Sequence, residues 1–187
     1  MERKWRVVSS KTLLKDRWID LRADHCVTPG GKEISPYYVL AYSDWAHIVA
    51  LTPDDGIILT RQYRHAAGEF LYELPSGSVD AADGDPERTA RRELEEETGY
   101  VAERWLKAGA LSPNPATHTN KAHIFVALDA ELKGIQKLDA GEEGLTVHVF
   151  PLAEVLDSLG AGLLGQSMHV ASLVLALTAI GRLKLTI

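Results

Sequence analysis

The amino-acid sequence predicts an α+β fold, an α/β/α sandwich built on a mixed β-sheet and preceded by an N-terminal antiparallel strand segment. Three observations indicate this fold class. Short β-like runs separated by turn signals fill the first half of the chain, one well-capped helix lies near the middle, and strands then return before two further helices. The order lacks the repeated strand–helix–strand units of a parallel sheet, and 187 residues suffice to bury a substantial core.

Residues 1–45 are expected to form the N-terminal β segment, and residues 46–187 the main domain. In the segment, Pro29-Gly30-Gly31 fits a hairpin turn between strands at 18–27 and 33–40. The segment also holds a dense set of aromatic side chains: Trp5, Trp18, Tyr37, Tyr38 and Trp45. Such side chains can form an interface, stack on a nucleobase or make a local core under the hairpin.

The elements of the main domain follow from turn and capping signals. Strands are expected at 47–51 and 57–64, on either side of the tight turn Pro53-Asp54-Asp55-Gly56, and at 70–74, where Pro75-Ser76-Gly77 ends the strand.

A helix is predicted from Pro86 to Thr98, because Asp85 is a suitable N-cap, Pro86 suits the first turn and Gly99 follows as a C-terminal stop. After it we expect strands at 105–111, 123–128 and 146–150, and helices at 152–159 and 167–183.

Composition and charge exclude several classes of function. Lys and Arg number 20 and Asp and Glu 26, so the net charge is −6, which disfavours binding to nucleic-acid phosphates. A single cysteine, Cys26, excludes an intrachain disulfide framework and a cysteine-rich zinc site, and suits a reducing cytoplasm. The first ten residues hold no apolar signal-peptide core, and the apolar stretch at 170–180 is too short for a membrane span of roughly 20 residues.

The most informative segment is the acidic run in the predicted helix. At about 100° per residue, Glu93, Glu96 and Glu97 share one helical face, whereas Glu95 points away from it. Arg92 lies four residues before Glu96 and can orient the cluster. Converging carboxylates on a rigid helix suit a hard divalent cation such as Mg²⁺ or Mn²⁺. Taken alone, the run could also be a solvated acidic face.

The loop Pro75-Ser76-Gly77-Ser78-Val79 and this helix together resemble the Nudix hydrolase signature, G-x5-E-x7-R-E-U-x-E-E-x-G-U, in which U is an aliphatic or aromatic residue. The C-terminal half matches fully, from Arg92 to Tyr100. The N-terminal half departs from the pattern. Counted from Gly77, the first glutamate position holds Asp83, and the spacing to Arg92 is one residue too long, with Gly84 as the insertion.

The resemblance implies a fold, a reaction and a set of metal ligands. Nudix hydrolases cleave a diphosphate linked to a second moiety, using divalent metals and water. By this resemblance, the carboxylates of Glu93, Glu96 and Glu97 and the carbonyl of Ser76 would hold Mg²⁺ or Mn²⁺, and Arg92 would orient the carboxylates.

The resemblance also implies a general base that deprotonates the attacking water. In the branch that acts on ADP-ribose, a glutamate in a loop before a late strand commonly takes this role. The loop at 139–144 offers Glu143, which is followed by Leu145 and Val147, with Glu142 as its rival. A helix glutamate such as Glu96 is a further alternative, and the acidic turn could instead be merely solvated.

Residues 61–77, RQYRHAAGEFLYELPSG, resemble the QYR…ELPAG segment of ADP-ribose and nucleoside-diphosphate-sugar pyrophosphatases. The resemblance implies that Arg64 contacts the diphosphate, and that Glu73 braces the metal loop or touches substrate. Pro115 stands 15 residues after Tyr100, as in that group.

The loop at 112–120 departs from the usual ADP-ribose loop and looks more like a group of bacterial Nudix proteins with poorly defined substrates. Asn114, His118 and Asn120 could bind a base or sugar there, or could be plain turn formers. The remaining histidines show no metal-ligand spacing and are expected to be structural.

These observations predict divalent-metal-dependent hydrolysis of the diphosphate bond of a nucleoside diphosphate linked to another moiety, with ADP-ribose or a related nucleoside-diphosphate sugar foremost. The alternatives are a CDP-alcohol, a GDP-sugar or a damaged nucleotide as substrate, or a non-catalytic nucleotide-sensing domain. N-terminal strands often build a homodimer in the ADP-ribose branch, so we expect a homodimer held by residues 1–45. We expect no nucleic-acid partner, no membrane association and a cytoplasmic location.

Overall fold

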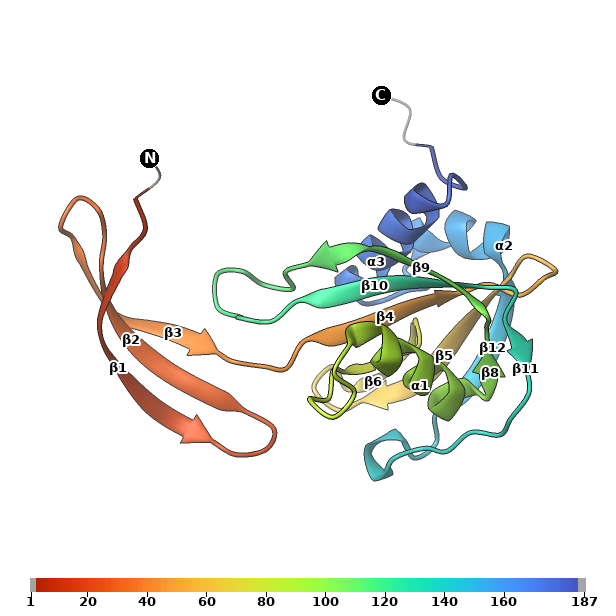
Figure 1. Ribbon diagram of the computed structural model, residues 1–187, viewed down its shortest axis with the longest axis horizontal. Helices are drawn as coiled ribbons and strands as arrows, with labels where there is room; N and C mark the ends of the chain where they lie inside the picture. Colours follow the sequence, from red (N-terminus) through yellow and green to blue (C-terminus); the bar gives the residue numbers. More distant parts are fainter. Residues whose placement is uncertain (1–2, 185–187) are drawn as a thin grey trace. The chain divides into compact units, whose positions relative to one another are not determined.

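The computed structural model describes residues 3–184, and the chain divides into two compact units (Figure 1). The first unit comprises the residues up to Ser43 together with Ser112–Lys121, and the second comprises Asp44–Leu111 and the residues from Ala122 onward. Mixed sheets covered by a few helices make up the second unit, so the predicted α+β class is confirmed.

The N-terminal unit is an antiparallel sheet in the order β1-β2-β3. Its strands are β1 (Arg6–Lys15), β2 (Asp20–Val27) and β3 (Glu33–Leu40). The hairpin predicted around Pro29-Gly30-Gly31 joins β2 to β3, and Lys32 N donates to Thr28 Oγ1 across the turn at 3.1 Å. Strand β1 has no counterpart among the predicted strands, because all of its residues are exposed and no apolar alternation marks it.

The loop at 112–121 belongs to this same unit, although it follows β9 in the chain. Leu40 N donates to the carbonyl of Thr117 at 2.8 Å, and Thr119 N donates to the carbonyl of Leu40 at 3.1 Å. The hydroxyl of Tyr37 also donates to the carbonyl of Ala116. The loop is therefore attached along the end of β3.

The second unit is built on a mixed four-stranded sheet in the order β7-β4-β10-β9. Its strands are β4 (Trp45–Ala50), β7 (Ser76–Ser78), β9 (Arg104–Leu111) and β10 (Ala122–Leu128). Strand β10 runs parallel to β4 and antiparallel to β9, and the short β7 pairs antiparallel with β4. This pairing fixes Ser76 opposite His47 and Gly77 opposite Ala46.

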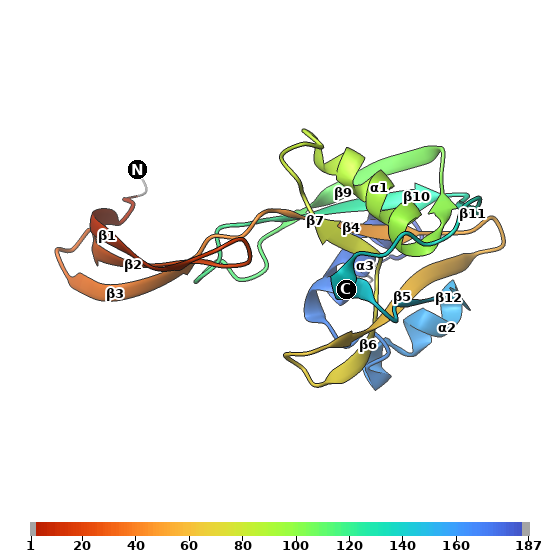
Figure 2. The ribbon, with the colours of Figure 1, turned by 90° about the horizontal axis from the view of Figure 1, so that it is seen from below.

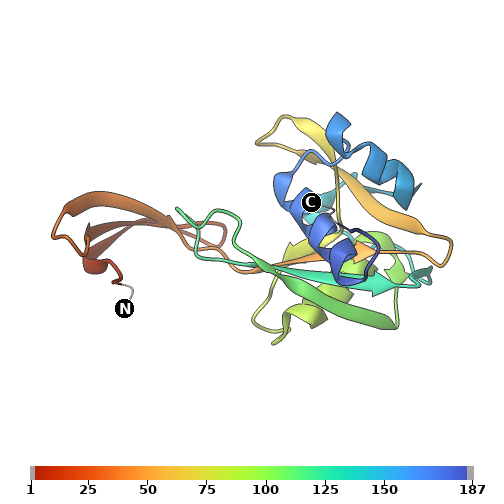
Figure 3. The same ribbon diagram turned by 90° about the horizontal axis from the view of Figure 1, so that it is seen from above.

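Helix α1 (Pro86–Thr98) covers one face of this sheet and helix α3 (Ser167–Ala179) covers the other (Figures 2 and 3). The period of two along β4 divides its side chains accordingly: Ile48 packs in the core under α1, whereas Val49 packs in the core under α3. In β10, Phe125 and Val126 divide in the same way. The predicted α/β/α sandwich is confirmed.

A second sheet, in the order β12-β5-β6, completes this unit. Its elements and the remaining short ones are β5 (Gly56–Arg64), β6 (Glu69–Glu73), β12 (Thr146–Pro151), β8 (Tyr100–Val101), β11 (Glu131–Leu132), α2 (Leu152–Asp157) and the 3₁₀ turns η1 (Ala140–Glu142) and η2 (Leu159–Ala161). Strand β6 ends directly before the Pro75-Ser76-Gly77 loop, so this sheet leads into the loop and the strand β7 that contact helix α1.

Helix α1 has the predicted bounds because its signals are local. The Asp85 side chain accepts a hydrogen bond from Glu87 N, and Gly99 ends the helix with a φ of 74°, a conformation that glycine adopts without strain. Helix α3 is shorter than predicted and ends at Ala179, with Ile180 as its C-cap. No helix among residues 3–184 is both long and apolar enough to cross a membrane.

Candidate active site

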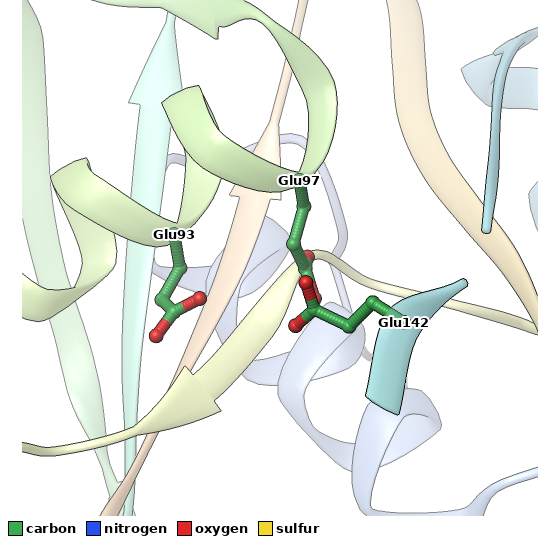
Figure 4. Close-up of side chains that lie close together, drawn as sticks. All are labelled: Glu93, Glu97 and Glu142. Carbon is green, nitrogen blue, oxygen red and sulfur yellow. The ribbon is translucent and has the colours of Figure 1, made fainter. Parts of the chain in front are cut away.

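Three carboxylates meet beside helix α1 in the second unit. Glu93 and Glu97 lie one turn apart on the buried side of the helix and are 8% and 2% exposed, and Glu142 reaches toward them from the turn η1 (Figure 4). One oxygen from each of the three lies within 4.8 Å of the other two. Charged carboxylates at such distances repel one another, and a bound cation would relieve this repulsion.

The loop before the helix holds the two helical carboxylates in place. Ser76 N donates to Glu97 Oε2 at 3.0 Å. A side chain at Gly77 would overlap the carboxylate of Glu93, so the glycine lets this carboxylate keep its position beside strand β7. Pairing of β7 with β4 and a hydrogen bond from Ile48 N to the carbonyl of Pro75 hold the loop on the sheet.

Arg92 forms ion pairs with three carboxylates at the edge of this group. Its guanidinium contacts Glu93 Oε1 at 2.9 Å, Glu96 Oε2 at 2.8 Å and Asp83 Oδ2 at 3.1 Å. Asp83 therefore reaches Arg92 despite the longer spacing of the N-terminal half of the signature. Glu96 shares the helical face as its spacing implies, but its carboxylate binds Arg92 and stands outside the group formed by Glu93, Glu97 and Glu142.

Burial disfavours the charged form of both helical carboxylates. It raises the pKa of Glu93 to about 7, although the nearby Arg92 opposes the shift. Burial also raises the pKa of Glu97 well above its usual value, although the hydrogen bond from Ser76 N opposes this. A divalent cation would favour the charged forms of both groups, and carboxylate oxygens are the ligands that Mg²⁺ and Mn²⁺ prefer. The donor set therefore fits such an ion.

The loop that carries Glu142 is attached to the C-terminal end of α1. Lys137 N donates to the carbonyl of Glu96 at 2.8 Å, and Gln136 Nε2 donates to the carbonyl of Glu97 at 2.8 Å. In the turn itself, Glu142 Oε2 accepts a hydrogen bond from Asp139 N at 2.9 Å. Glu143, the glutamate that the sequence pattern favoured, is exposed and takes no part in the carboxylate group.

The loop Ser76-Gly77-Ser78, which contacts Glu97 and Glu93, also forms part of the wall of a cavity of about 550 Å³. Arg64 lines the cavity. Its guanidinium donates two hydrogen bonds to the buried carboxylate of Glu73, from Nε at 2.9 Å and from Nη2 at 2.5 Å. Glu73 therefore braces Arg64. His47 and His169, for which the sequence predicts only a structural role, also line this cavity.

Three of the expected substrate-binding residues lie in the other unit. Asn114 organises its own loop, with Nδ2 donating to Thr117 Oγ1 at 2.9 Å and Oδ1 accepting from Ala116 N at 3.3 Å. Asn120 is buried and donates to the carbonyl of Ser43 at 3.1 Å, and Pro115 is exposed. The side chains of Asn114 and Asn120 thus stabilise the loop.

Comparisons with known proteins agree with this combination of fold and site. The family model "NUDIX domain" matches residues 43–167, and the model "Nucleoside diphosphate sugar hydrolase N-terminal domain" matches residues 5–40. The chain belongs to the Nudix family and is a hydrolase.

Two curated relatives carry the name ADP-ribose pyrophosphatase. The protein from Mycobacterium tuberculosis is 31% identical over 96% of this chain and 86% of its own length. The protein from Bacillus subtilis is 29% identical over 73% of this chain and 74% of its own length. A solved structure described as an ADP compounds hydrolase shares the fold with a TM-score of 0.84, at 24% identity, over 97% of this chain and 98% of that one.

Proposed function

We propose that this protein hydrolyses the diphosphate bond of a nucleoside diphosphate linked to a sugar, with ADP-ribose as the foremost substrate, and that it requires Mg²⁺ or Mn²⁺. The observation that carries the proposal is the meeting of Glu93, Glu97 and Glu142 next to a cavity lined by Arg64. The names of the relatives from Mycobacterium tuberculosis and Bacillus subtilis support the choice of ADP-ribose.

The divalent ion would be held by the carboxylates of Glu93 and Glu97 and by the carbonyl of Ser76. Glu96, the other ligand that the resemblance implies, binds Arg92 and would lie at the edge of the metal site. When bound, the ion supplies positive charge that stabilises the charge developing on the phosphate oxygens. Arg64 would bind the diphosphate, and its pairing with Glu73 presents the guanidinium in one orientation.

Glu142 is the better candidate for the general base than Glu143. A base must lie within hydrogen-bond reach of the water it deprotonates, and Glu142 is the loop glutamate whose carboxylate lies in the cluster. Glu143 stays the rival because the sequence offset favours it, and Glu96 remains the candidate from the helix.

We also propose that the protein is a homodimer held by residues 1–45. The N-terminal unit exposes several large apolar side chains, among them Val7 and Leu14 on β1 and Trp18 in the turn after it, and Trp18 is 72% exposed. Light scattering at micromolar concentration should give twice the monomer mass, and a monomer would contradict this proposal. The single cysteine, Cys26, is free, which is consistent with the proposed cytoplasmic location.

The direct test of the function is a panel of diphosphate compounds assayed with Mg²⁺ and with Mn²⁺. ADP-ribose should be cleaved to AMP and ribose 5-phosphate, and the activity should disappear with a chelator. Preferred cleavage of a CDP-alcohol, a GDP-sugar or a damaged nucleotide would keep the hydrolase but change its substrate. Binding of these compounds without cleavage would favour a nucleotide-sensing domain.

A further inference from the structure

The cavity beside the carboxylates holds two adjacent imidazoles, tilted by 56° relative to each other, that the hydrolytic chemistry does not use. The rings of His47 (β4) and His169 (α3) lie with their centroids 4.6 Å apart, and both side chains line the cavity. Both are almost fully buried, at 3% and 2% exposed. Because buried polar groups normally have hydrogen-bond partners, a buried polar ring that lines a cavity is suited to bind a polar group of a ligand.

One of these rings has a defined proton position. Leu74 N donates to His169 Nδ1 at 2.8 Å, so Nδ1 acts as an acceptor and carries no proton. A neutral imidazole then carries its proton on Nε2, which makes that nitrogen a donor. No hydrogen bond within the described part of the chain occupies His169 Nε2. Burial, together with the neighbouring His47 and Arg64, lowers the pKa of His169 well below its usual value, which keeps the ring neutral.

An acceptor lines the same cavity. Gln166 Oε1 is buried and has no hydrogen-bond partner among residues 3–184. A hydroxyl group both accepts and donates, so it complements this uncharged donor and acceptor together. Other ligand groups fit this site less well. A phosphate is bound better by protonated imidazoles than by a neutral ring, and a quaternary ammonium cannot accept a hydrogen bond from the N–H donor.

The position of the cavity further limits the chemical class of the ligand. Its wall includes Ser76 and Gly77 of the metal loop and also Arg64, so the group inside it lies directly next to the diphosphate. In ADP-ribose a ribose stands on each side of the diphosphate, the terminal ribose on one side and the ribose of the nucleoside on the other. Much of the remaining lining is small, and the large apolar side chains are those of Trp45 and Leu71.

We propose that His169 is a specificity-determining residue, which donates a hydrogen bond through Nε2 to a hydroxyl oxygen of the sugar half of the substrate. The inference rests on the proposed function and deepens it. Of the two riboses of ADP-ribose, the proposal assigns the terminal one, in the ribose 5-phosphate half, to His169, and inhibition by the two products distinguishes the halves.

Two substitutions separate the structural hydrogen bond of His169 from the proposed recognition. In His169→Asn the amide oxygen takes the place of Nδ1, so it keeps the bond from Leu74 N and loses the donor at Nε2. In His169→Gln the amide takes the place of Nε2 and loses the partner of Leu74 N.

The test is inhibition of ADP-ribose hydrolysis by each product, together with the thermal midpoint of each variant. In His169→Asn, the inhibition constant of ribose 5-phosphate should rise about tenfold, the loss expected for one hydrogen bond, with the thermal midpoint near that of the wild type. The inhibition constant of AMP should change less than twofold. His169→Gln should melt earlier and yet bind ribose 5-phosphate within about threefold of the wild type.

Unchanged inhibition by ribose 5-phosphate in His169→Asn would overturn the inference, and so would a loss confined to AMP. If His169→Asn does not fold, a tenfold loss in His169→Gln overturns it instead. Wild-type protein that cleaves no nucleoside-diphosphate sugar would overturn the proposed function together with the inference. Wild-type activity with an unaffected His169→Asn would overturn the inference alone.

Discussion

Helix α1 and the loop that follows β11 both bring carboxylates to the site, but they hold them by different means. Glu93 and Glu97 are buried on a helix that packs on the central sheet, and the β7 loop contacts both of them. Glu142 stands on a short 3₁₀ turn, where its carboxylate accepts a backbone N–H from Asp139, three residues earlier. The helix carboxylates are therefore held by the packing of α1 on the sheet, whereas the loop carboxylate is held by its own turn and by the hydrogen bonds that attach its loop to the end of α1.

The largest effect should come from the helix. Glu97→Gln removes one negative charge from the proposed metal site at nearly constant shape, and should lower kcat with Mg²⁺ by about 10²–10³-fold. Glu95→Gln is the matched control on the same helix, because Glu95 is exposed and should leave kcat unchanged. Steady-state kinetics of the two variants makes the comparison, with circular dichroism to verify folding. A Glu97→Gln enzyme as fast as the wild type would remove the helix from the mechanism.

The loop should show a different pattern. Glu142→Gln should lower kcat about 10²-fold and leave substrate affinity nearly intact, because a general base acts on the water rather than on ground-state binding. Glu143→Gln should be much milder. Single-turnover hydrolysis and a binding titration of both variants measure the two quantities. The reverse order would assign the base to Glu143, and full activity in both would move it to the helix, to Glu96.

A smaller effect should come from the contact between the loop and the helix. Gly77→Ala places a methyl group against the Glu93 carboxylate and should displace it, lowering kcat about tenfold, with little change in the free energy of unfolding because the contacted atoms are the end of a flexible side chain. Gly160→Ala is the control, because an added Cβ there has open space around it. Denaturant unfolding and kinetics of both variants would test this. Equal kcat values of the two would mean that β7 and α1 need no glycine between them.

The smallest effect concerns stability in acid. Burial lowers the pKa of His47 to about 4, and that of His169 shifts in the same direction. Below about pH 6.5 the unfolded chain binds protons that the folded chain excludes, so stability is full above that pH and is lost as the pH falls toward 4. The thermal midpoint should therefore drop by a few degrees more in the wild type than in His47→Asn over this range. Parallel curves for the two proteins would contradict the burial argument.

Local signals explain which parts could be predicted from the sequence. The bounds of α1 follow from Asp85, Pro86 and Gly99, which act within one turn of each end. The convergence of Glu93 and Glu97 follows from helical geometry alone.

Features that depend on contacts between distant segments could not be read in the same way. His47 and His169 stand in apolar runs far apart in the chain, and only the packing of α3 on β4 brings them into one cavity. The loop glutamates are neighbours in the sequence, so only the turn at Ala140–Glu142 distinguishes them. Strand β1 is exposed throughout and gave no apolar pattern to detect.

The central claim is that the carboxylates of α1 hold a divalent cation, and the most direct test is Mn²⁺ binding followed by electron paramagnetic resonance, which needs no substrate. Wild-type protein and Glu95→Gln should bind Mn²⁺ with the same affinity, and Glu97→Gln should bind it at least tenfold more weakly. Equal affinity in all three proteins would contradict the account.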